Sequence, residues 1–323
     1  MTVESRLRTA AALVLSIVLG VTVTACGGSK PTPGELTVAW VVDPCWAQVP
    51  VAEDLGFFAD AGVTVKVVPF PTGAAALEAL AGGAVDVANG GDVPTSAAAL
   101  KNQRLRIIAD GARWDGGRFV VRKSSDITTI PDLAGRRIAV PLGSSAHYFA
   151  TKFLTQAGVQ AELIQTGPGE IPGAIGNRDV DAVAVFQPAL AKAVEALNGD
   201  SLELQGSPKY NQHSLYLANE NTIAAKKPEL AKFLSAVAEA DAPLTDRTPE
   251  AMAAVAKATA LDETLVDNVL REFVFKVELG PELAADLADR ARWAQGLGRI
   301  PADAQIPDYQ TRIDASVLGS NEQ

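Results

Sequence analysis

Short apolar runs alternate with helical patterns of apolar residues along most of the chain, starting near residue 36. This alternation predicts an α/β protein with largely parallel strands. The predicted strands lie at 36–42, 65–68, 85–88, 105–109, 118–122, 137–140, 162–165, 180–185, 202–205 and 214–218. After residue 218 the pattern predicts only helices, at 228–241, 249–260, 262–273 and 281–296. The last of these has an apolar face that should pack on the fold, formed by Leu283, Leu287, Ala291 and Ala294.

Two stretches of the chain, 79–99 and 174–193, follow the same plan. Each has a short helix, a turn, a Val-Asp pair, an apolar strand and a loop, and then a proline, Pro94 or Pro188, that opens the next helix. Because loops after the carboxyl ends of parallel strands bind ligands in open α/β sheets, the repetition predicts two lobes facing each other across a cleft. The strands predicted between residues 137 and 205 form a second series, which we expect to be inserted into the first lobe. The chain would then pass between the lobes twice, near 121–124 and 210–214, and these two segments would form a hinge.

The N-terminus has the features of an export signal. Two arginines precede an apolar run, 10–23, that is short for a transmembrane helix. The run ends in VTAC, followed by two glycines, which resembles a bacterial lipobox with Cys26 as the lipidated residue; an ordinary signal peptide that contains a cysteine is the alternative. The predicted organisation is a signal peptide at 1–25, a tether at 26–35, a first lobe at 36–121 plus 214–320, and a second lobe at 122–213.

Composition and charge narrow the possible functions. The 323 residues are 48% hydrophobic and 20% charged, which suits two packed lobes. A net charge of −10 without clustered Lys and Arg disfavours nucleic-acid binding, and an anionic ligand would need capture by local groups. With Cys26 lipidated, Cys45 has no disulfide partner. The two histidines, His147 and His213, lack Cys or carboxylate neighbours at ligand spacing, so we expect no metal and no cofactor.

Residues 140–149 read VPLGSSAHYF and allow two hypotheses. In the first, the chain turns at Gly143 and a helix capped by Ser144 or Ser145 directs free N–H groups at an anion in the cleft; a plain helix cap without a ligand is the alternative. In the second, these serines and His147 form a hydrolase site. The hydrolase is disfavoured, because GSSAH lacks the second glycine of a nucleophile elbow and His147 follows the serines on the same helix.

Other candidate ligand contacts lie in loops that should reach the cleft. Gly91 allows close backbone approach, whereas Asp92 either caps the next helix or pairs with a ligand ammonium group. Trp46 and Trp114 either stack on a ligand or belong to the core, and Glu170 either neutralises an amine or caps a helix. The remaining candidates are Asp43, His147, Phe186, Gln187 and Tyr216.

Several segments together resemble the solute-binding proteins of nitrate, sulfonate and taurine ABC importers. They are LAGGAVDVANGGDVP, IPDLAGRRIAVPLGSSAHYF, AGVQAELI and NRDVDAVAVFQPAL. Similarity to the taurine-binding branch of this family is carried by two features: IAVP followed by HY, and GLGRIPADAQIPDY near the C-terminus. The resemblance implies a type II periplasmic-binding fold and a monomer that closes on a small anion or zwitterion, such as taurine or another sulfonate. It also implies no catalysis, a lipid anchor outside the cytoplasmic membrane, and a permease with an ATPase as separate chains.

One departure from this family pattern concerns the ligand. The resemblance implies an acidic residue on the strand that returns to the first lobe, where this sequence has Ser214 and Leu215. An aminosulfonate would therefore need Asp92, Asp43 or Glu170 for its amine; otherwise the ligand is a simple sulfonate or carboxylate. Nitrate or a thiamine-pyrimidine precursor as ligand, an enzyme on the same fold, and a surface lipoprotein without a transport role stay open as alternatives.

Overall fold

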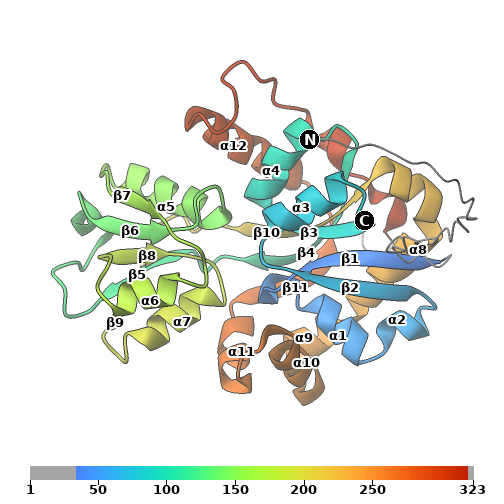
Figure 1. Ribbon diagram of the computed structural model, residues 1–323, viewed down its shortest axis with the longest axis horizontal. Helices are drawn as coiled ribbons and strands as arrows, with labels where there is room; N and C mark the ends of the chain where they lie inside the picture. The colour runs from blue at the N-terminus through green and yellow to red at the C-terminus, as the bar shows by residue number, and fades with distance from the viewer. Residues whose placement is uncertain (1–33, 319–323) are drawn as a thin grey trace, which may run out of the picture. The chain divides into compact units, whose positions relative to one another are not determined.

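The computed structural model describes residues 34–318, which contain two separate β-sheets (Figure 1). Sheet A has the strand order β11-β4-β10-β3-β1-β2, and sheet B has the order β7-β6-β8-β5-β9. The strands of sheet A are β1 (Glu35–Val41), β2 (Thr64–Phe70), β3 (Val87–Gly91), β4 (Leu105–Trp114), β10 (Gln212–Asn219) and β11 (Phe273–Glu278). Those of sheet B are β5 (Arg118–Arg122), β6 (Arg137–Val140), β7 (Glu162–Gln165), β8 (Ala182–Ala184) and β9 (Ser201–Gln205). Every predicted strand is therefore present; β5, β6 and β7 have the predicted ends, and the ends of the others are shifted.

The prediction of largely parallel sheets is wrong, because both sheets are mixed. β1 pairs in parallel with β2 and β3, and β6 pairs in parallel with β7 and β8. The remaining pairs, which involve β4, β5, β9, β10 and β11, are antiparallel. The cause is the path of the chain: β4 leads out of sheet A, β10 leads back, and the two lie side by side in opposite directions.

Helices cover both faces of each sheet, which explains why central strands such as β3 are buried along their whole length. On sheet A, α3 (Gly73–Ala81) and α4 (Asp92–Lys101) pack on one face, and α8 (Glu220–Glu239) packs on the other with α1 (Gln48–Asp54) and α2 (Phe57–Asp60) beside it. On sheet B, α5 (Ser145–Gln156) packs on one face, and α6 (Ile171–Gly176) and α7 (Ala189–Ala196) pack on the other. No helix within residues 34–318 has the length and apolar character needed to cross a membrane.

The chain after β10 departs from the prediction of helices alone. α8 starts eight residues before Pro228 and is kinked at Lys226, whose φ of −130° is not helical, as expected close before a proline. α9 (Asp241–Asp246), α10 (Pro249–Thr259) and α11 (Glu263–Leu270) follow. β11 then adds an edge strand, in which Phe273, Phe275 and Val277 are buried and alternate with outward side chains. This two-residue period of buried residues indicates a strand, whereas the prediction has only helices after residue 218.

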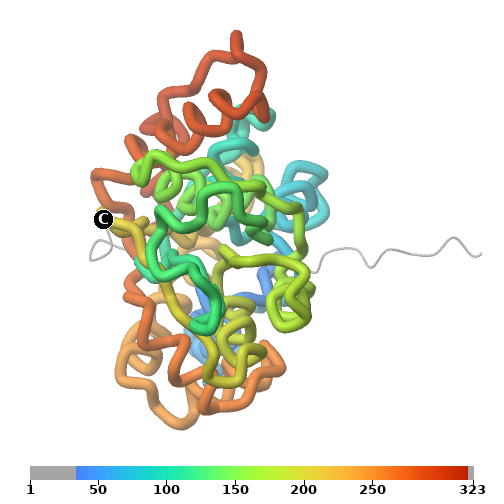
Figure 2. Tube along the Cα trace, turned by 90° about the vertical axis from the view of Figure 1, so that its left-hand side faces the viewer, coloured from blue at the N-terminus to red at the C-terminus, as the bar shows by residue number. Residues whose placement is uncertain are grey.

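The last long helix, α12 (Leu283–Gly296), packs through the predicted apolar face, since all four of its predicted core residues are buried. It contacts α4 on sheet A. Figures 1 and 2 show α12 on the opposite side of sheet A from α9, α10 and α11. The C-terminal part of the chain therefore covers sheet A on both sides.

Two segments carry the chain between the sheets, at 115–117 and 206–211. The first lies earlier than the predicted crossing at 121–124, and the second overlaps the predicted one; the domain boundaries given above stay a prediction. Glycines occupy the first crossing because other residues approach it closely. A Cβ at Gly116 would lie 2.5 Å from Trp114 Nε1, and one at Gly117 would lie 3.0 Å from Phe149.

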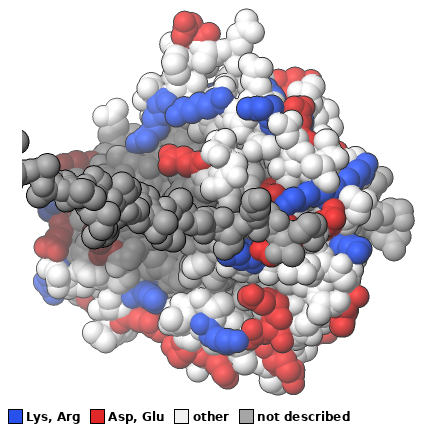
Figure 3. All heavy atoms as spheres, turned by 45° about the vertical axis from the view of Figure 1, so that its right-hand side comes forward, with Lys and Arg blue, Asp and Glu red and all other residues white. Residues whose placement is uncertain are grey.

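Charge on one face of the protein is mixed in sign. On the face shown in Figure 3, Lys and Arg side chains lie as separate groups among Asp and Glu. This distribution, with the net charge of −10, gives an anion little long-range attraction. A site for an anion must therefore depend on local donors.

Candidate functional site

A cavity of about 350 Å³ lies where loops from sheet A meet loops from sheet B. Sheet A contributes the segment after β1, the start of α3 and the residue Gly91 at the end of β3. Sheet B contributes residues 141–145, which follow β6, and Phe186, Pro188 and Ala189, which follow β8. The cavity therefore lies at the carboxyl ends of parallel strands in both sheets, and its size suits a small solute.

Three helices begin at the wall of this cavity with free backbone donors. The N–H groups of Gly73 and Ala74 in α3, Ser145 in α5 and Ala189 in α7 have no acceptor among the described residues. The first N–H groups of a helix lack partners within it, and the helix dipole adds positive potential there. The cavity therefore offers several fixed donors to an anion.

The loop before α5 has the predicted cap, although not every predicted donor. Ser144 is the N-cap and its Oγ accepts from Ala146 N at 3.2 Å. The Ser144 N–H is already bonded to Pro141 O, and the Gly143 N–H to His147 Nδ1 at 3.1 Å. Of the two serines at the start of this helix, only Ser145 therefore has a free backbone donor.

His147 lies behind this loop and does not line the cavity. Burial, followed by the charge of Arg299, lowers the pKa of His147 to about 4. The ring is therefore neutral near pH 7 and can accept the Gly143 hydrogen bond, which holds the loop at the positive φ of 85° that glycine allows. Its ring packs edge-on against Trp293.

The serine hydroxyls are bonded to groups other than a histidine. Ser144 Oγ donates to Pro141 O at 2.6 Å, and Ser145 Oγ donates to Asp92 at 3.1 Å. Because His147 is occupied by Gly143, no serine at this cavity has an adjacent general base within the described chain. The hydrolase hypothesis therefore has no geometric support, and the arrangement favours binding over nucleophilic chemistry.

Aromatic rings form part of the wall from both sides. Trp46 lines the cavity from sheet A, with its Nε1 donating to Leu215 O at 3.2 Å, and Phe186 lines it from sheet B. The indole is almost fully buried, so the two earlier interpretations of Trp46, wall and core, both apply. Fixed rings of this kind can pack against the apolar part of a ligand.

Asp43 is the one charged residue that lines the cavity in the described part of the chain. It is 4% exposed, and its Oδ1 accepts from Cys45 N at 2.8 Å. Burial raises the pKa of the Asp43 carboxyl to about 6, a rise that the Cys45 hydrogen bond only partly opposes. No Lys or Arg lies within salt-bridge distance of it among the described residues. The wall therefore contains a buried carboxylate without a cation.

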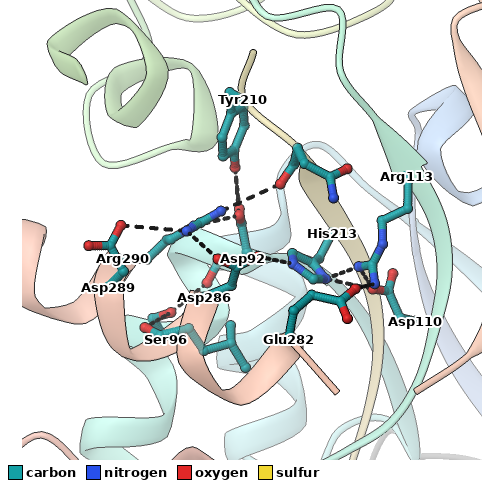
Figure 4. A network of polar contacts seen from close by, with 12 residues as sticks. Asp92, Ser96, Asp110, Arg113, Tyr210, His213, Glu282, Asp286, Asp289 and Arg290 are labelled. Carbon is teal, nitrogen blue, oxygen red and sulfur yellow. Dashed lines mark hydrogen bonds and ion pairs between the residues drawn. The ribbon is translucent and has the colours of Figure 1, made fainter. Parts of the chain in front are cut away.

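Asp92 does not line the cavity, so of its two predicted roles, helix cap and partner of a ligand ammonium group, the second has no support; it lies at the start of α4. Its fully buried carboxylate accepts from Tyr210 Oη at 2.5 and 2.7 Å and from Arg290 Nε at 3.0 Å (Figure 4). It also accepts from Ser145 Oγ at 3.1 Å and from Val93 N at 2.8 Å. With these partners, Asp92 has no free capacity for a ligand amine, and it links α4, α5, α12 and the second crossing.

Arg290 and its neighbours on α12 extend this network (Figure 4). The guanidinium lies over the Tyr148 ring at 4.7 Å and the Tyr210 ring at 5.4 Å. Tyr148, on α5, also bonds to Asp289 on α12. Helix α12 therefore connects the sheet A side of the fold to the helix whose N-terminus lines the cavity.

The network continues through His213 on β10. Its Nδ1 lies 2.7 Å from Asp110 on β4, and its Nε2 lies 2.9 Å from Asp286 on α12. Arg113 bonds to both Asp110 and His213 (Figure 4). In residues 34–318, no group of three or more His, Cys, Asp or Glu is arranged to hold a metal ion.

The other predicted contacts lie outside the cavity wall. Gln187 donates to Glu272 at 3.1 Å and accepts from Ala191 N in the first turn of α7. Tyr216 lies on β10 in sheet A, is fully buried, and donates to Gln48. Trp114 is buried against Glu272, and Glu170 is exposed and accepts from Gly167 N. The predicted residues that line the wall are Asp43, Trp46, Gly91, Ser144, Ser145 and Phe186.

Two parts of the wall were missed from the sequence. One is the start of α3, where Thr72 caps the helix by accepting from Ala75 N; a threonine between a strand and an Ala-rich stretch is a recognisable cap signal. The other is Gln212, which is 3% exposed and lines the cavity from the start of β10. No local motif marks Gln212. Cys26 lies outside the described residues.

Comparison with known proteins supports a binding role for this fold. Residues 44–250 match the family model described as NMT1/THI5 like. The taurine-binding periplasmic protein of Escherichia coli (strain K12) is 27% identical over 86% of this chain and 91% of its own. A putative aliphatic sulfonates-binding protein of Bacillus subtilis (strain 168) is 30% identical over 68% of this chain and 69% of its own. The family resemblance stated from the sequence is thereby confirmed.

Among solved structures, the periplasmic aliphatic sulphonate binding protein SsuA from Escherichia coli has a TM-score of 0.77 at 23% sequence identity. The match covers 87% of this chain and 98% of that one. This likeness confirms the predicted fold class, two α/β lobes of the periplasmic-binding type with a C-terminal helical part.

The Asp92–Arg290 pair predicts a strong asymmetry between single and double substitution. Arg290→Met should lower the free energy of unfolding by about 3 to 5 kcal/mol, because it leaves the buried Asp92 carboxylate without its cation. The double variant Asp92→Asn, Arg290→Met removes the buried charge at position 92 and leaves only the partly exposed Asp286 and Asp289 without Arg290, so it should recover much of this loss. Urea denaturation checks both; equal losses in the single and double variants would contradict the assignment.

The raised pKa of Asp43 predicts a stability that depends on pH. Since the folded-state pKa of about 6 exceeds the ordinary 3.8, the unfolded chain loses this proton first, and the free energy of unfolding falls as pH rises from about 4 to 6. The difference between the two pKa values corresponds to about 3 kcal/mol. The ligand-free Asp43→Asn variant should therefore have a higher free energy of unfolding than the wild type at pH 7. At pH 4 it should have no such advantage. Urea denaturation at both pH values tests this, and a difference that does not change with pH would refute it.

Proposed function

Because this chain belongs to the NMT1/THI5-like family, we propose that it is the solute-binding receptor of an ABC importer. Its ligand is a small sulfonate-type anion or zwitterion, such as taurine or an alkanesulfonate, held in the cavity between the two sheets. The observation that carries the proposal is the convergence of three helix N-termini, with free N–H groups, on one cavity of about 350 Å³.

The chemistry of the wall supports a sulfonate-type ligand. A sulfonate has three acceptor oxygens, and backbone N–H groups at helix starts are donors suited to such an anion. The rings of Trp46 and Phe186 give the short carbon chain of the solute an apolar surface. The names of two relatives, which include taurine and aliphatic sulfonates, agree with this ligand class.

The receptor would act outside the cytoplasmic membrane and deliver its ligand to a permease with an ATPase. Two of the similar proteins are named as periplasmic, which supports an extracytoplasmic location. We also propose that Cys26 is lipidated and that the segment after it tethers the domain to the membrane. Binding, in place of serine-based hydrolysis, is supported by the hydroxyls of Ser144 and Ser145, which are bonded to Pro141 and Asp92 and not to a base.

Substitution of Ser145 by proline tests the role of the backbone N–H. Ser145 is the first residue of α5, a position that tolerates proline, and Ser144 has the extended φ and ψ of −98° and 175° that a residue before proline prefers. Ser145→Pro therefore removes the N–H while the helix start is kept. We expect at least a tenfold loss of affinity for ethanesulfonate by calorimetry, because a hydrogen bond to a charged group contributes about 1.5 to 3 kcal/mol.

Ser145→Ala is the matched control for this experiment. It keeps the N–H and removes the hydroxyl bonded to Asp92, so any effect of that bond is measured separately. The proposal predicts weaker binding in Ser145→Pro than in Ser145→Ala. Equal affinities in the two variants, with both folded by thermal melting, would exclude the Ser145 N–H as a ligand donor.

A further inference from the structure

Three carboxylates were candidates for pairing with a ligand amine, and the structure separates them. Asp92 is buried and already has Arg290, Tyr210 and Ser145 as partners. Glu170 is exposed and lies outside the cavity wall. Asp43 alone lines the cavity.

The Asp43 carboxylate has the features of a group that awaits a cation. It is buried, it accepts hydrogen bonds only from the backbone N–H and the thiol of Cys45, and no Lys or Arg lies within salt-bridge distance of it among the described residues. Buried charges in proteins are normally paired, because an isolated one is costly. The neighbouring Cys45 thiol supplies no charge, since burial and then the Asp43 charge raise its pKa well above the ordinary range.

Gln212 provides a second and independent sign of a missing partner at the same place. Its Nε2 donates to Cys45 Sγ at 3.3 Å, which holds the amide beside the residue that also bonds Asp43. Its Oε1 is buried and has no hydrogen-bond partner. Gln212 is 3% exposed and lines the cavity, so a buried acceptor without a partner belongs to a residue of the cavity wall.

We infer that Asp43 and Gln212 form a subsite for the ammonium group of the ligand. The inference rests on the proposed function and narrows it to zwitterions that carry both a primary amine and a strong anionic group. An ammonium group has three N–H donors and a positive charge, so it can bond the Asp43 carboxylate and the Gln212 Oε1 together. The free N–H groups at the starts of α3, α5 and α7 then bind the anionic group of the same molecule.

A pair of ligands that differ only in the amine tests the subsite. Calorimetry on the wild-type protein should show that 2-aminoethanesulfonate binds at least tenfold more tightly than ethanesulfonate. In Asp43→Asn this preference should fall below about threefold, with ethanesulfonate binding unchanged or tighter. Gln212→Met, which keeps the size of the side chain without the acceptor, should reduce the preference by about threefold or more.

Gln165→Met is the control variant. Gln165 is also a glutamine in the cavity wall, but its Oε1 is already bonded to Leu142 N at 3.0 Å. Any loss in this variant should affect both ligands equally, so the preference for the amine should stay at the wild-type value. Thermal melting of each variant verifies folding.

The outcomes separate this inference from the proposed function. If the wild type binds ethanesulfonate as tightly as 2-aminoethanesulfonate, or if Asp43→Asn keeps the preference, the ammonium subsite is wrong and the sulfonate receptor stands. If the wild type binds neither compound, the proposed function fails and the subsite fails with it.

Discussion

The buried Asp92 carboxylate is the interaction on which the arrangement around the cavity depends. It begins α4 on sheet A, and it accepts hydrogen bonds from α5 on sheet B, from α12 and from the second crossing segment. A buried carboxylate with this many partners is costly to disrupt, because each partner would also lose its bond. The residue at its α5 end, Ser145, presents its backbone N–H to the cavity. The Asp92 side chain therefore links the contact between the two lobes to the shape of the cavity.

Backbone N–H groups are suitable donors for an anion in a protein that carries a net negative charge. The wall contains no Lys or Arg among the described residues, and the protein as a whole carries a charge of −10. Peptide donors at helix starts are fixed by the fold, so they lose no side-chain entropy when a ligand binds. A zwitterion enters such a site more easily than a simple anion, because its net charge is zero and the acidic protein does not repel it.

Local patterns in the sequence were sufficient for most of the fold. All ten predicted strands and the apolar face of α12 are present, because both depend on the spacing of apolar residues along one segment. The mixed direction of the sheets could not be read in this way, since it follows from where β4 and β10 lead. The loop before α5 was also predictable, because glycine and serine caps act within a few residues.

The candidate site was harder to predict, because the role of a polar side chain depends on residues distant in the sequence. Asp92 and Asp43 look alike in the sequence, as each follows a strand and precedes a helix. What distinguishes them is Arg290, which lies 198 positions after Asp92 and pairs with it. Gln212 is 167 positions from Cys45, and only the fold reveals that its amide oxygen is left without a partner.

The state of Asp43 connects stability to function. In the ligand-free protein the folded chain carries the cost of a buried carboxylate without a cation, which is expressed in its raised pKa. A ligand ammonium group would remove that cost, so part of the binding free energy would come from relief of an unfavourable state that already exists. A simple anion would gain nothing from Asp43 and would be repelled by it. The same buried charge that lowers the stability of the ligand-free protein would therefore act as its means of selecting a zwitterion.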